Sequence, residues 1–212
     1  MQEIDSLHDK MRAFEKAINS RKSLDVYKNN KFNKQFSVLL KDWNYLKIII
    51  ERIEATDSEN ATQLGLDLKS LYVFGRVFSE SLLYIASLFI GSSPKINWTK
   101  IGQFIKSVET NLVSEPTEFK TFWKENEKAI MNLYETFRYR NDVLHEKDSN
   151  TEWTFAWPGR SNLDNVYIAN VPWREDIGKK KEKKTLNARM IMQTLNLQGS
   201  LILDYLGSVS KS

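Results

Sequence analysis

The feature that most constrains this fold is a long apolar segment, from Thr62 to Ile90, that contains no proline. Its apolar residues recur at spacings of three and four, which is the period of an α-helix. They form one stripe of Leu64, Leu68, Leu71, Phe78, Leu82, Ile85 and Phe89, and a second of Val73, Val77, Tyr84 and Leu88. A helix that is apolar nearly all round is normally buried. The pattern therefore predicts a central core helix.

Further helices are predicted on both sides of this segment. The chain has only 8 glycines and 4 prolines, so few positions interrupt a helix. Helical periodicity covers residues 3–18, 33–53, 98–112, 118–145 and 186–206. The predicted fold is mainly α.

The period changes from helical to two after Glu146. Trp153, Phe155 and Trp157 alternate with smaller residues, and a second apolar run follows at residues 165–171. Alternation of this kind is typical of strands. A small β-hairpin is predicted near residues 151–173, and the lysine-rich stretch at 178–184 is interpreted as a solvated loop.

The length favours a single domain over residues 1–212. Its parts are N-terminal helices at 1–56, a core at 62–146, the hairpin insertion at 151–173 and a C-terminal helix at 186–206.

Composition excludes several classes of site. The chain has no cysteine and two histidines, so disulfides, thiolate zinc sites and histidine-rich metal sites are not expected. No metal and no cofactor are predicted. The net charge of +4 permits a nucleic-acid partner without requiring one.

The N-terminal sequence and the length of the apolar runs predict a cytoplasmic protein that does not cross a membrane. The N-terminus lacks the order of a signal peptide. The longest apolar run, Ser81–Ile90, is shorter than the roughly 20 residues needed to span a bilayer.

The sharpest functional feature is Arg140 on the apolar seam of the predicted helix 118–145. Steps of four and three back from Leu144 reach Arg140, Phe137, Leu133, Ile130 and Asn126. A buried guanidinium costs several kcal/mol unless an anion satisfies it. Either a core carboxylate pairs with Arg140, or the helix borders a polar cleft that also contains His145.

Helical geometry separates the two residues, because five steps of about 100° place Arg140 and His145 about 140° apart. Asn141 and His145 lie on one face instead. A helix end near His145, or a second subunit, is needed to bring an arginine and a histidine onto one phosphate. In the structural alternative, Arg140 is a core ion-pair partner and His145 caps the helix end.

The stretch from Arg140 to His145 resembles the motif of the HEPN superfamily, in which four to six residues separate an arginine from a histidine. A polar residue commonly follows that arginine, as Asn141 does here. The resemblance implies an antiparallel α-helical bundle with the motif at the end of a long helix. It also implies metal-independent RNA cleavage, with His145 as proton-transfer group, Arg140 as phosphate ligand and Asn141 in support.

HEPN domains usually dimerise so that two motif helices form one cleft. The expected function is thus a homodimeric endoribonuclease of a toxin or phage-defence (abortive infection) system, with RNA as substrate and an antitoxin or regulatory protein as a candidate partner. The alternative is a non-catalytic HEPN-like module for dimerisation or ligand sensing. Lys147 stands where a modified tyrosine occurs in one branch of HEPN toxins, so the resemblance does not extend to neutralisation by that route.

Three weaker candidates accompany the motif. Glu80, on the narrow polar line of the central helix, is the predicted acidic partner of Arg140, with Arg76 one turn earlier as a competing partner. The tryptophan-rich hairpin either packs on the core or stacks RNA bases. Weak RNA contacts are assigned to the basic stretch, at Lys180, Lys181, Lys183 and Lys184.

Overall fold

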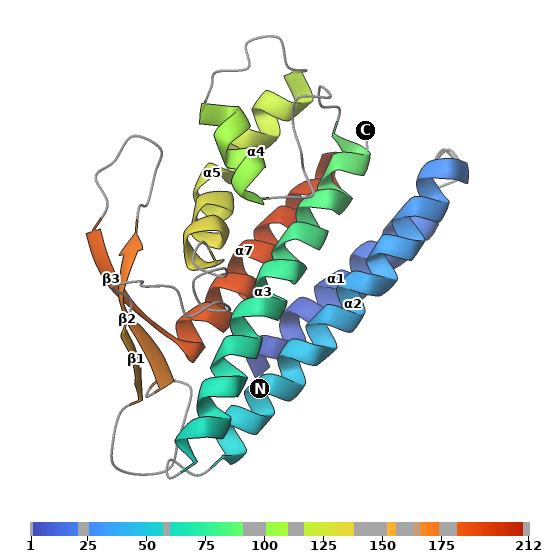
Figure 1. Ribbon diagram of the computed structural model, residues 1–212. Helices are drawn as coiled ribbons and strands as arrows, with labels where there is room; N and C mark the ends of the chain where they lie inside the picture. The colour runs from blue at the N-terminus through green and yellow to red at the C-terminus, as the bar shows by residue number, and fades with distance from the viewer. Residues whose placement is uncertain are drawn as a thin grey trace.

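The computed structural model is mainly helical, with a small sheet at one side of a long bundle (Figure 1). It describes residues 2–20, 26–56, 60–90, 101–109, 117–137, 152–155, 164, 166–173 and 182–209. The helices are α1 (Gln2–Asn19), α2 (Val26–Ala55), α3 (Ala61–Phe89), α4 (Ile101–Glu109), α5 (Thr117–Phe137) and α7 (Ala188–Val209). The strands are β1 (Glu152–Phe155), β2 (Val166–Trp173) and β3 (Glu182–Asn187).

The central helix is α3, as its composition predicts. It contacts α2, α4, α5, α7 and β2, and Asn60 caps its N-terminus by accepting a 3.1 Å hydrogen bond from the backbone N–H of Gln63. The first of its two predicted apolar stripes is buried except at its last residue, Phe89, which is half-buried. Val73, Val77 and Tyr84 of the second stripe are also half-buried, because the neighbouring elements cover one side of α3.

Helices α2 and α3 run antiparallel along most of their lengths. Gln35 donates a 3.2 Å hydrogen bond to Ser81, the rings of Tyr45 and Phe74 lie 5.2 Å apart, and Arg52 pairs with Asp67. Along these three contacts the residue numbers rise in α2 and fall in α3, so the two helices run antiparallel.

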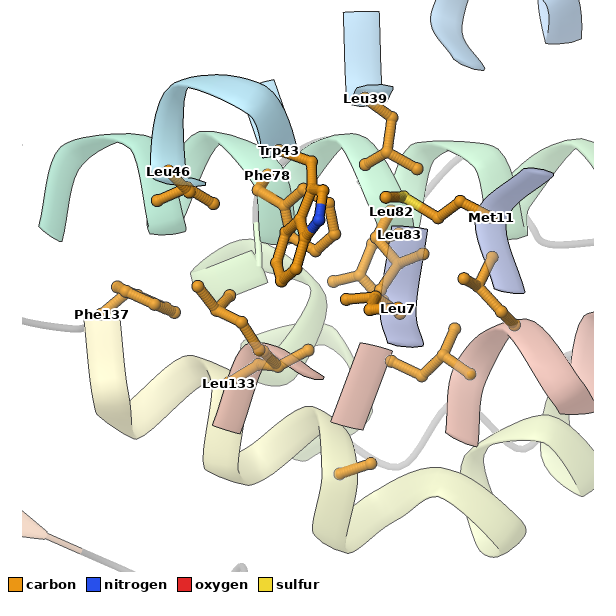
Figure 2. Close-up of a cluster of buried hydrophobic side chains, with 14 of the residues drawn as sticks. Leu7, Met11, Leu39, Trp43, Leu46, Phe78, Leu82, Leu83, Leu133 and Phe137 are labelled. Carbon is orange, nitrogen blue, oxygen red and sulfur yellow. The ribbon is translucent and has the colours of Figure 1, made fainter. Parts of the chain in front are cut away.

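The core is built from side chains of α1, α2, α3, α5 and α7, with Trp43 and Phe78 near its centre (Figure 2). Their ring centroids lie 5.2 Å apart. Leu7 and Met11 bring α1 into this cluster, and both are fully buried. Smaller contributions come from Ile105 of α4 and Leu186 of β3. The sheet and α4 therefore share one hydrophobic core with the bundle.

The sheet is antiparallel in the order β1-β2-β3. β1 pairs with β2 in the region of the predicted hairpin, with Trp153 opposite Ile168 and Phe155 opposite Val166. The third strand corrects the loop interpretation for residues 182–184, while residues 178–181 of that stretch lie outside the described residues. β3 pairs with β2, with an irregularity between Ile168 and Val171.

Two helix boundaries also differ from prediction. α2 begins at Val26, seven residues before the predicted start at Asn33, because Phe32 packs against Phe14 of α1 with ring centroids 5.9 Å apart. α7 begins at Ala188 rather than Leu186. Asn187, the last residue of β3, accepts a 2.7 Å hydrogen bond from the N–H of Met190 and so begins the helix.

The apolar segment of α3 is longer than the run at 81–90 from which the sequence prediction was made. By length and composition alone, Thr62–Phe89 could cross a membrane. Inside the fold, 56% of the most apolar part of this helix is buried. Core helices of soluble proteins have the same length and composition, and the burial favours a core helix over a membrane span.

Candidate active site at the end of α5

The buried seam of α5 matches the predicted one as far as the structure describes this helix. Asn126, Ile130, Leu133 and Phe137 are all buried. Asn126 satisfies its side-chain amide within the helix, by donating a 3.0 Å hydrogen bond to the carbonyl of Phe122. The seam is therefore buried as far as Phe137, which is three residues before Arg140.

Phe137 is held by an unusually close approach to α3. A Cβ atom added at Gly75 would lie 2.4 Å from Cε1 and 2.5 Å from Cζ of Phe137. The Tyr72 ring packs edge-on against Phe137, with centroids 5.6 Å apart. Only glycine at position 75 leaves room for this ring, so the sequence of α3 sets where the end of the described α5 docks.

Arg76 makes the polar contact at the same place. Its Nε donates a 2.8 Å bond to Oε1 of Glu80, and its Nη1 donates a 3.3 Å bond to the backbone carbonyl of Phe137. The two side chains are 17% and 27% exposed, so the pair lies at the boundary between core and solvent. One guanidinium thus links α3 to the last described residue of α5.

Helix α4 forms the third side of this corner. A Cβ at Gly102 would lie 3.4 Å from the ring of Tyr134 and 4.0 Å from Nη2 of Arg76. Tyr134 itself packs partly buried against the core. Arg76 therefore lies where α3, α4 and α5 meet.

The predicted site residues divide into two groups. Arg140, Asn141 and His145 lie outside the described residues, as do Lys180 and Lys181. Glu80 is described, and it pairs with Arg76, the competing partner that the sequence left open.

The remaining two lysines, Lys183 and Lys184, lie in β3 rather than in a loop, opposite Pro172 and Val171. The tryptophan-rich segment forms strands, with Trp153 in β1 and Trp173 in β2, while Trp157 lies outside the described residues.

The structure adds one acidic residue that the sequence did not single out. Glu135 of α5 is fully buried, although helical geometry places it about 160° from the Leu133 seam. Met131, on the same flank of α5, is also fully buried. Because α5 contacts β2 as well as α3 and α7, this helix is buried on two sides. Periodicity alone assigns Glu135 to the solvent side, so no sequence signal marked it.

Within the described ranges, no three His, Asp or Glu side chains gather in a way that could hold a metal ion. Comparisons with protein-family models, with curated proteins and with solved structures found no match. The assignment of a function therefore depends on the motif and on the geometry around it.

Proposed function

We propose that this protein is a HEPN-like, metal-independent endoribonuclease whose motif residues follow the end of the described α5. The observation that carries the proposal is the double attachment of Phe137 to α3, through the Gly75 contact and the Arg76 hydrogen bond. Arg140 follows Phe137 by three residues, and three residues span at most about 11 Å. The Arg76–Glu80 pair at this corner carries no net charge, so in the proposal Arg140 itself supplies the positive charge for an anionic substrate.

The chemistry assigns one role to each motif residue. His145 removes the proton from a ribose 2′-OH, and the resulting alkoxide attacks the adjacent phosphorus. The bond to the 5′-oxygen breaks and this oxygen takes a proton from the protonated imidazole, which leaves a 2′,3′-cyclic phosphate and a 5′-OH. An unperturbed histidine titrates near pH 6.5, which suits proton transfer at neutral pH. Arg140 stabilises the negative charge on the phosphate, and Asn141 orients the imidazole.

A homodimer is part of the proposal, because Arg140 and His145 diverge by about 140° on one regular helix. The arginine of one subunit facing the histidine of the other removes this conflict. Such a ribonuclease fits a cytoplasmic toxin or phage-defence effector under the control of an antitoxin or regulatory protein. Lys183 and Lys184 of β3 are the proposed outer contacts of the RNA backbone.

Cleavage of RNA by the purified wild-type protein and two variants tests the proposal. We expect cleavage in EDTA with 2′,3′-cyclic phosphate ends, and its loss in both His145→Ala and Arg140→Ala. Circular dichroism and light scattering check that each variant keeps its fold and its dimer. Metal-dependent cleavage, or cleavage that survives His145→Ala, contradicts the mechanism. A wild type inactive on several RNAs favours the non-catalytic module for dimerisation or ligand sensing.

A further inference from the structure

Most of the exposed large hydrophobic side chains in the described structure lie on two neighbouring helices. Val38, Tyr45 and Ile48 of α2 are 40%, 37% and 50% exposed, and Leu66 of α3 is 54% exposed. The remaining two, Leu197 and Leu201, lie on α7. Apolar side chains that gather on one surface mark an interaction site more often than scattered ones do.

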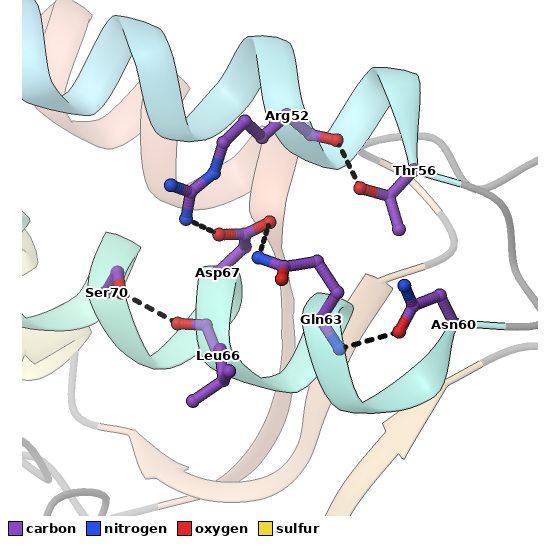
Figure 3. A network of polar contacts seen from close by, with 7 residues as sticks. All are labelled: Arg52, Thr56, Asn60, Gln63, Leu66, Asp67 and Ser70. Carbon is purple, nitrogen blue, oxygen red and sulfur yellow. Dashed lines mark hydrogen bonds and ion pairs between the residues drawn. The ribbon is translucent and has the colours of Figure 1, made fainter.

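The residues on α2 and α3 form one continuous surface. Val38 and Tyr45 are seven residues apart, which is about two helical turns, and Ile48 lies about 60° away around α2. On α3, Leu66 aligns with the half-buried Val73 and Val77. The helices meet along this edge through the contact of Tyr45 with Phe74. They also meet through the pairing of Arg52 with Asp67, which Figure 3 shows. We call this surface the α2–α3 face, defined by Val38, Tyr45, Ile48, Leu66, Val73 and Val77.

The charge on the α2–α3 face is positive. Lys34 and Lys41 are exposed and lie within about 40° of Tyr45 around α2. Lys41 also holds its Nζ 5.6 Å from the Tyr45 ring centroid. The charge of Arg52 is matched by the buried Asp67. The exposed Glu51 lies about 60° from Ile48, at the edge of the face that is turned away from α3, so Lys34 and Lys41 leave the face with a positive net charge.

We propose that the α2–α3 face binds an acidic amphipathic helix of a partner protein. Apolar residues at helical spacing on the partner match the stripe on α3, and flanking carboxylates match Lys34 and Lys41. A second copy of this chain fits less well, because a two-fold axis through the face brings its lysines near like charges. The proposal is independent of the ribonuclease activity.

Binding of a synthetic acidic helix to the full chain tests the proposal. The probe is a fluorescent peptide of about 18 residues, or about five turns, with Leu on one face and Glu on its flanks. We expect saturable binding, weakened at least about tenfold by Leu66→Glu and reduced by Lys41→Glu. Leu201→Glu is the matched control, since Leu201 is 55% exposed on α7, and it should leave binding unchanged. A peptide with Lys in place of Glu should bind at least about tenfold more weakly.

The other occupants are outcomes that overturn the proposal. Absence of saturable binding, or equal effects of Leu66→Glu and Leu201→Glu, contradicts a site on this face. Phosphatidylcholine vesicles with and without phosphatidylglycerol are tested beside the peptide. Vesicle binding that Leu66→Glu removes, without peptide binding, assigns the face to lipid. Self-association that Leu66→Glu abolishes, again without peptide binding, assigns it to a second copy. Circular dichroism confirms that both leucine variants are folded.

Discussion

Arg76 donates a 3.3 Å hydrogen bond from Nη1 to the backbone carbonyl of Phe137, a residue 61 positions later in the chain. The same guanidinium pairs with Glu80 one turn along α3. A single side chain therefore connects the central helix to the helix that leads into the proposed motif. The ring of Phe137 is seated against Gly75 at the same level of α3, so polar and apolar contacts fix the same point.

Gly75→Ala should destabilise the protein by about 1–3 kcal/mol, because its methyl group overlaps the Phe137 ring in a packed core. The free energy of unfolding, measured by urea denaturation, checks this value. Gly102→Ala is the matched control. Its new Cβ meets Tyr134 at an ordinary 3.4 Å, and alanine favours a helix over glycine by about 1 kcal/mol. Equal effects of the two substitutions contradict the close contact.

Arg76→Met should destabilise the fold by about 1 kcal/mol, since two hydrogen bonds are lost at a partly exposed position. The larger effect is expected at the end of α5, where amide hydrogen exchange should accelerate near Phe137. The proposed RNA cleavage should fall with it. Arg76→Lys keeps the charge but has one nitrogen in place of the separate Nε and Nη1 donors, and it should recover part of the protection. Unchanged exchange near Phe137 in Arg76→Met contradicts the attachment.

Arg52→Ala should destabilise the fold by about 1–3 kcal/mol. The Asp67 side chain is fully buried, and this substitution leaves Gln63, whose Nε2 donates a 3.1 Å bond, as its other hydrogen-bonding partner in Figure 3. Arg12→Ala is the control, because Arg12 forms its ion pair with Glu15 on the surface of α1, where such pairs contribute little. Thermal unfolding of both variants should separate them by several degrees, by roughly 2–4 °C per kcal/mol.

Asp42→Asn should raise the melting temperature at neutral pH. Burial raises the pKa of Asp42 above its ordinary value of 3.8, and Lys41 offsets part of that effect. A raised pKa means that the folded state favours the protonated acid. The contribution of protonated Asp42 to the free energy of unfolding is complete below pH 3.8, and it is lost as the pH rises through the raised pKa of Asp42. The gain from asparagine should therefore shrink on acidification toward pH 3.8. Asp9→Asn, at an exposed position on α1, should show no such gain.

Local periodicity was sufficient to predict the helical bundle, the central position of α3 and the seam of α5. Alternation of large apolar residues also located the β1–β2 pair. These signals work because a helix or strand buries one side in a fixed period. The motif from Arg140 to His145 is also a prediction from a short stretch of sequence, and RNA cleavage assays test it.

Tertiary structure decided what no local pattern encodes. Arg76 donates to the backbone carbonyl of Phe137, 61 residues later, because α3 and α5 pack together at the corner with α4. Glu135 is buried because β2 covers a flank of α5 that periodicity assigns to solvent. The lysine-rich stretch enters β3 because β2 offers an edge with unpaired backbone groups. In each case the deciding partner is distant in the chain, and only the packing of whole elements brings it into contact.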